Sequence, residues 1–210
     1  MSGFKKLNTI NGFDFENLKN AKQNNYAWSM AEFGEYIYVG TARNIPWNAI
    51  EILGENAKAP LLISNDSKDN SGEIWRYKKD ESLPWQRVYK AENNSGINGF
   101  RYMVVHASEN SSPALYAASF SFRGNMVILK TTDGSNWTEV STGISGGSSR
   151  AMVSFNGLLY VAVIEDSAAL GGNKPLLYYS KDPEFYDFQL VFDSEDPELI
   201  KGKNPIGNWN

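Results

Sequence analysis

The sequence predicts an all-β protein built from three copies of a four-stranded antiparallel unit. Short aliphatic and aromatic runs alternate with turn signals between residues 26 and 193. Their order recurs with a period of about 50 residues, a spacing typical of a repeated supersecondary unit. No long amphipathic helix is indicated, and only residues 45–55 carry the boundary residues of a short one.

The first half of each unit is a strand, a tight turn and a second strand. A methionine marks the first strand, and an aliphatic–Tyr–small pattern marks the second. The methionines are Met30, Met103 and Met152, and the tyrosines are Tyr38, Tyr116 and Tyr160. In the third unit the turn is Asn156-Gly157, a pair that favours a two-residue hairpin because both residues tolerate the positive φ of a type I′ turn.

The second half of each unit is a strand, a turn opened by aspartate, and a strand preceded by an aromatic residue. The aspartates are Asp80, Asp133 and Asp182, and the aromatic residues are Trp85, Trp137 and Phe188. An aspartate that opens a turn accepts hydrogen bonds from backbone amides two or three residues later. We expect the aromatic side chain to pack back over this turn, so both residue types have a structural role.

The repeat divides the chain into three predicted blades with flanking segments, because a four-stranded unit of this period is typical of a β-propeller blade. The predicted parts are a lead-in segment (1–25), blade 1 (26–92) with an insertion (42–72), blade 2 (98–143), blade 3 (149–193) and a tail toward a further blade (194–210).

Three blades leave two blade faces uncovered. Blades bury both faces against neighbours, and propellers close with about four or more of them. Two copies in a six-bladed ring, a different chain that supplies the remaining blades, and a fragment of a longer chain would each meet this requirement. We expect a homo-oligomer or a second chain that carries the other part of the propeller.

The turn at residues 131–137 resembles a known motif. Its sequence, Thr-Thr-Asp-Gly-Ser-Asn-Trp, is similar to the Asp-box of sialidase-type propellers, with one residue missing before the glycine. Residues 77–80 and 179–182 resemble degenerate copies, and residues 155–161 resemble the second strand of kelch-like blades. The resemblance covers residues 26–192 and implies Asp-boxes on the outer rim, away from the central channel. Asp-boxes occur in glycosidases, lectins and scaffolds, so no single activity is implied.

Trp28, Arg101 and Arg150 share one repeat position, two residues before the common methionine. The first strands of propeller blades line the central channel, which makes these side chains candidates for ligand binding. Guanidinium groups bind carboxylates through two parallel hydrogen bonds, so repeated arginines suit an anion or a sugar carboxylate. The alternative is a structural role, in which the arginines pair with carboxylates or carbonyls of neighbouring blades.

The insertion of blade 1 contains two further candidates, Arg43 and Trp47. Residues 41–46 are similar to the Arg-Ile-Pro opening of sialidases, but they have an extra asparagine and follow the second strand. Trp47 has no repeat equivalent and suits either an exposed ligand contact or burial beneath the insertion. Residues 64–73 are rich in oxygen ligands that suit Ca²⁺, yet Lys68 in their midst favours a solvated loop. We therefore predict no cofactor and no metal site.

Composition narrows the classes of partner and reaction. The net charge is −4 and basic residues are spread along the chain, which disfavours nucleic acids and anionic membranes. Without cysteine, and with His106 as the one histidine, thiolate zinc sites and Ser-His or Cys-His nucleophiles are not expected. We find no signal peptide and no apolar run of about 20 residues, which favours the cytoplasm but leaves the compartment open.

The favoured function is a non-catalytic binding or scaffold module with lectin-like carbohydrate binding. One alternative is a protein-interaction module that completes a propeller with a second chain. Another is a glycoside hydrolase or lyase that acts from the central channel.

Overall fold

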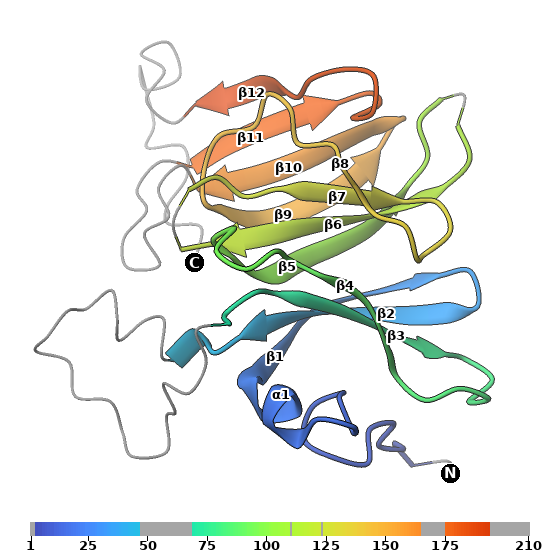
Figure 1. Ribbon diagram of the computed structural model, residues 1–210. Helices are drawn as coiled ribbons and strands as arrows, with labels where there is room; N and C mark the ends of the chain where they lie inside the picture. Colours follow the sequence, from blue (N-terminus) through green and yellow to red (C-terminus); the bar gives the residue numbers. More distant parts are fainter. Residues whose placement is uncertain (1–2, 47–68, 110, 123, 165–174, 194–210) are drawn as a thin grey trace, which may run out of the picture.

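The computed structural model describes residues 3–46, 69–109, 111–122, 124–164 and 175–193 (Figure 1). Within these residues a short helix, α1 (Leu18–Gln23), precedes twelve strands of one antiparallel sheet. The predicted all-β class is confirmed. None of the helices in the described ranges is long and apolar enough to cross a membrane.

The strands form three consecutive four-stranded meanders, which we call units 1, 2 and 3. Unit 1 contains β1 (Asn24–Phe33), β2 (Tyr36–Arg43), β3 (Glu73–Lys78) and β4 (Gln86–Lys90). Unit 2 contains β5 (Ile97–His106), β6 (Ala114–Ser121), β7 (Ile128–Thr131) and β8 (Thr138–Glu139). Unit 3 contains β9 (Ser148–Phe155), β10 (Leu158–Ile164), β11 (Pro175–Ser180) and β12 (Gln189–Asp193). Each strand pairs antiparallel with the next one in its unit.

Successive units are joined by single backbone pairs rather than by long ladders. Ala42 of β2 pairs with Gly99 of β5, and Phe120 of β6 pairs with Ser148 of β9. The sheet does not close on itself within the described ranges. In unit 3 the turn between β9 and β10 has φ values of 48° at Asn156 and 73° at Gly157, as expected for a type I′ hairpin.

Two hydrophobic cores lie between the units, one on each face of unit 2. In β6, Leu115 and Ala117 point toward unit 1, whereas Tyr116 and Ala118 point toward unit 3. This division follows from the alternation of side chains along a strand. We call the face of a unit toward the preceding unit its leading face, and the face toward the next unit its trailing face. Unit 2 is covered on both.

The N-terminal segment, residues 3–23, covers the leading face of unit 1 (Figure 1). Phe13 packs on Trp75 and Trp85, with ring centroids 6.2 and 4.6 Å apart, and Trp75 is buried. The helix α1 begins after Asn17, whose side chain accepts a hydrogen bond from the amide of Asn20 as an N-cap. A segment of the same chain thus lies where a preceding unit would pack.

Candidate functional site

The first strand of each unit carries a β-bulge at the repeat position of the predicted ligand contacts. In β1, β5 and β9 the pairing with the second strand skips one residue at this position. The skipped residues are Trp28, Arg101 and Arg150. A bulged residue falls out of the ladder, so its side chain is turned away from the regular alternation of the strand. The same local irregularity therefore redirects all three side chains.

The structure brings these bulged side chains together, because β5 contacts both β1 and β9. The Arg101 guanidinium carbon lies 4.9 Å from the centre of the Trp28 ring, a cation–π contact. Arg101 also donates a hydrogen bond from Nη1 to the Ser148 hydroxyl at 3.1 Å. Trp28 meets the edge of Phe120, with ring centroids 5.3 Å apart. Arg101 is thus held by its neighbours on two sides.

The two arginines lack an acidic partner in the described part of the chain. Burial and then the nearby Arg150 guanidinium lower the pKa of Arg101 to about 10. Burial also lowers the pKa of Arg150, whose Nε is buried without a hydrogen-bond partner among the described residues. A carboxylate beside either group would raise its pKa instead, and buried donors are normally satisfied. The arrangement is therefore a positively charged site suited to an anion.

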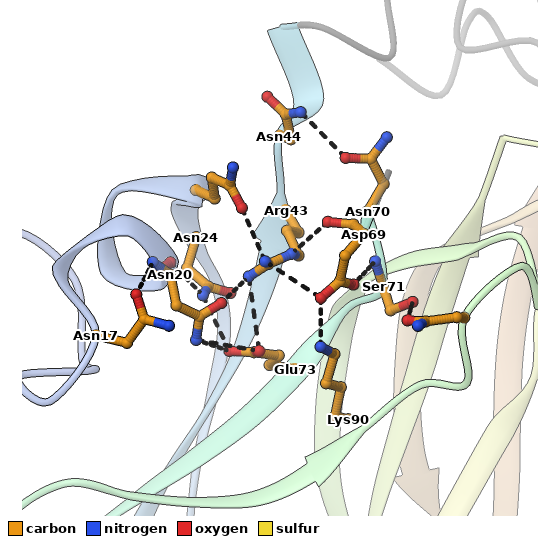
Figure 2. Close-up of polar contacts among 12 residues, drawn as sticks. Asn17, Asn20, Asn24, Arg43, Asn44, Asp69, Asn70, Ser71, Glu73 and Lys90 are labelled. Carbon is orange, nitrogen blue, oxygen red and sulfur yellow. Dashed lines mark hydrogen bonds and ion pairs between the residues drawn. The ribbon is translucent and has the colours of Figure 1, made fainter. Parts of the chain in front are cut away.

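Arg43 belongs to a different cluster, a buried polar network between the N-terminal segment and unit 1 (Figure 2). Its side chain is buried, and Nε donates to the carbonyl of Asp69 at 2.8 Å. Nη2 donates to the side chain of Gln23 at 2.8 Å, and Nη1 donates to Asn20. These contacts join Arg43 to the N-terminal segment and to the residues that precede β3.

Glu73 is the centre of this network and is fully buried. Its carboxylate accepts hydrogen bonds from Asn24 Nδ2, Trp75 Nε1 and Arg87 Nη1, each at 2.9 Å. Arg43 Nη1 lies 3.6 Å from the same carboxylate (Figure 2). A buried charge is tolerated when it is paired and hydrogen-bonded in this way. The network therefore has a clear structural role, in which Arg43 takes part.

The turn aspartates accept backbone hydrogen bonds in every unit. Asp80 and Asp133 each accept from the amide two residues later, at 2.9 and 2.8 Å, and Asp182 does so at 3.1 Å. Hydrogen bonds from Ser82 lower the pKa of Asp80 to about 2, and those from Asn136 and its neighbours lower that of Asp133.

The aromatic residues after these turns lie on the leading faces. Trp85 packs on Phe13 of the N-terminal segment, and Trp137 packs on Tyr38 of unit 1 with ring centroids 6.3 Å apart. Phe188 is buried in the core between units 2 and 3. Each aromatic residue thus contacts the part of the chain that packs before its unit, which is the N-terminal segment for unit 1 and the preceding unit for units 2 and 3. The sequence pattern alone did not indicate this partner.

Other predicted features can be placed more briefly. Trp47 and residues 64–68 of the calcium candidate lie outside the described residues, and so does the predicted tail 194–210. The described ranges contain no group of three or more His, Asp or Glu side chains arranged for a metal ion. His106 is buried, and its Nδ1 lies 2.8 Å from the hydroxyl of Ser154 across the gap between units 2 and 3.

Sequence reasoning missed the role of Glu73, although a signal was present. The strand pairings place Glu73 at the position of Val127 in unit 2 and Leu176 in unit 3. An acidic residue where the other units carry aliphatic ones indicates that this face of unit 1 has a different neighbour.

No family model matches the chain, and no curated protein matches it in sequence.

Proposed function

We propose that the chain is a non-catalytic binding module of β-propeller type that binds a small carboxylate, such as a sugar acid, at Arg101 and Arg150. The observation that carries this proposal is the meeting of the two bulged arginines without an acidic partner in the described ranges. The stacked units support the propeller part of the proposal. Their first strands lie side by side, as the first strands of blades do around a channel.

A carboxylate suits this site for electrostatic and geometric reasons. Two neighbouring guanidinium groups, of which Arg150 lowers the pKa of Arg101, gain from a shared anion, and planar donors match carboxylate oxygens in pairs. Beside them, Tyr26 is half exposed and stacks on Trp28, with ring centroids 6.2 Å apart and planes 24° apart. An exposed ring next to an anion site suits the apolar face of a sugar, which favours a sugar acid over an inorganic anion.

Calorimetric titration with glucuronate and with glucose tests the proposal. We expect glucuronate to bind and glucose to bind far more weakly, because the neutral sugar lacks the carboxylate. Arg101→Gln and Arg150→Gln should each weaken glucuronate binding roughly ten- to hundredfold, the usual effect of losing a charged hydrogen-bond partner. Lys181→Gln, which removes an exposed cation of unit 3, is the matched control and should change little. Equal affinity for the two sugars, or no loss with either arginine variant, would sink the proposal.

A stability measurement separates ligand binding from a structural role for Arg150. If Arg150 joined neighbouring units, Arg150→Met would destabilise the fold. A buried guanidinium nitrogen without a partner is instead a burden on the folded state, so we expect this variant to be as stable as the natural chain or more so. Chemical denaturation without ligand gives the answer directly.

A second candidate function, an assembly module, is favoured by a separate observation. The trailing face of unit 3 carries exposed apolar side chains, among them Val153 and Phe155, whereas unit 2 is covered on both faces. Exposed apolar faces of this kind mark interaction sites.

A further inference from the structure

The trailing face of unit 3 has the same construction as two faces that are buried inside the molecule. Tyr38, Tyr116 and Tyr160 occupy equivalent places in the second strands, opposite Arg76, Lys130 and Tyr179 of the third strands. Tyr38 and Tyr116 are each 1% exposed and lie in the two cores between units. Tyr160 is only half-buried.

Aliphatic residues of the third strands show the same difference between buried and open faces. Ile74 and Ile128, both fully buried between units, correspond to Leu177 in unit 3, which is half-buried. Around Tyr160 and Leu177 the face has Val153 at 54% and Phe155 at 60% exposure. Positions that are buried between units are thus left partly open on unit 3.

This face also carries no charge on its described central strands. The side chains of β9, β10 and β11 that alternate away from the core with unit 2 are uncharged, and most are apolar. They are Ala151, Val153, Phe155, Leu158, Tyr160, Ala162, Ile164, Pro175, Leu177 and Tyr179. A face without charge does not repel its own copy and has no charge pattern that selects a different partner.

The leading face of unit 1, at the opposite end of the stack, is not available for such an apolar contact. The leading face of unit 1 is occupied by the N-terminal segment, and Glu73 and Arg43 lie buried beneath it. A head-to-tail ring of two copies would seat unit 3 of one copy on this face. It would have to displace the segment and leave buried charges without their partners, which is strongly unfavourable.

We infer that the trailing face of unit 3 binds the same face of a second copy of this chain, as a two-fold symmetric dimer. Two copies that meet through this face form a complete contact, because each copy uses the patch that the other one uses. Burial of this apolar face drives the association. The inference deepens the proposed assembly function and does not depend on the arginine site.

Cysteine cross-linking tests the geometry of the dimer, because the chain contains no natural cysteine. Val153→Cys places a thiol on the trailing face of unit 3, and Met30→Cys places one on unit 1, where Met30 is 68% exposed. With a short bis-maleimide we expect Val153→Cys to yield a covalent dimer with itself. We expect no dimer from Met30→Cys alone and no mixed product from the two variants together.

Light scattering on the full chain gives the companion measurement. The expected mass is twice the 23.5 kDa of one chain, reduced to one chain by Tyr160→Asp and unchanged by Phe4→Asp, a fully exposed control in the N-terminal segment. Leu158→Asp repeats the test on the same face if Tyr160→Asp does not fold.

Each alternative result contradicts the inference in a recognisable way. A monomer up to high micromolar concentration means that the face is free or takes another partner. A mixed product between the Val153 and Met30 variants means a head-to-tail ring. If glucuronate still binds in either case, the carboxylate site stands and only the dimer is lost.

Discussion

The leading face of unit 1 and the trailing face of unit 3 are the two ends of one stack, and they have opposite chemistry. The first is covered by the N-terminal segment over a buried carboxylate and guanidinium, Glu73 and Arg43. The second presents uncharged and largely apolar side chains around Tyr160. Both ends derive from the same repeated unit, so the difference reflects what each face contacts and not a difference in backbone.

The leading face of unit 1 shows how the end of a repeat array can be covered by a segment of the same chain. A wholly apolar face accepts any apolar surface, whereas a buried ion pair with fixed hydrogen bonds accepts only a neighbour that satisfies it. The side chains of Asn20, Gln23 and Asn24 supply those bonds from α1 and its ends. The N-terminal segment is thus specified by chemistry that unit 3 lacks.

The largest effect is expected at Glu73. Glu73→Leu copies the aliphatic residue that unit 3 has at this position, but it removes the fully buried carboxylate that faces Arg43 and Arg87. We expect a loss of about 3–5 kcal/mol in the free energy of unfolding. Hydrogen exchange of residues 17–24 should rise first, because these residues bind the network. Glu32→Ala is the control, since Glu32 forms an exposed ion pair with Lys79 at 2.7 Å, and its loss should leave stability nearly unchanged.

If Glu73→Leu left both stability and exchange unchanged, the polar network would not hold the N-terminal segment. The double variant Arg43→Met/Glu73→Leu sharpens this test, because it removes both charges together. It should recover much of the lost stability, as replacement of buried ion pairs by apolar side chains often does.

A smaller loss of stability is expected from substitutions at two glycines. One glycine lies at the contact between units 1 and 2, and the other lies in unit 3 at the open end of the stack. Gly134 has φ +75° and a Cβ there would lie 1.8 Å from the hydroxyl of Tyr38, across the contact between units 1 and 2. Gly157 has φ +73°, but no heavy atom of the described residues beyond its two chain neighbours lies within 4 Å of the position of its Cβ. Gly157→Ala therefore measures the backbone strain alone, about 1 kcal/mol. Gly134→Ala should cost at least about 2 kcal/mol. Equal losses in urea denaturation would mean that units 1 and 2 do not pack as described.

The repeat itself was predictable because it rests on local patterns. Alternation, the Asn156-Gly157 turn and the aspartate turns each depend on a few neighbouring residues. What each repeated residue contacts was not predictable in the same way. Met30, Met103 and Met152 look alike in sequence, yet Met30 is 68% exposed and the other two are buried. A preceding unit covers the second and third methionines, while the N-terminal segment leaves the first one open.

The arginine site was predicted in part. Register in the sequence put Trp28, Arg101 and Arg150 at one repeat position, and the structure brings them together. The bulges that redirect these side chains were not predicted, because a bulge depends on how two strands pair and not on one strand alone. The Glu73 network was missed for a related reason, since its partners come from a segment outside the repeat.

The smallest expected effect is a pH dependence that reports on the inner contact between units 2 and 3. His106 is 1% exposed, and burial lowers its pKa, opposed by Asp182 and assisted by Lys130. The unfolded chain therefore takes up a proton near the ordinary pKa of about 6.5, while the folded chain does so only at lower pH. The free energy of unfolding should be highest above about pH 6.5 and should fall as the pH drops from 7 toward 5. Asp80 titrates only at lower pH, so it does not contribute in this range.

His106→Asn removes this titration and should flatten the slope between pH 7 and 5, whatever it does to absolute stability. Urea midpoints at several pH values measure it, and Asp80→Asn, which affects only more acidic conditions, is the matched control. A stability that rises as the pH falls through this range would mean that His106 is charged in the folded chain. The hydrogen bond between His106 and Ser154 of unit 3 would then be donated by a charged imidazolium and not shared by two neutral groups.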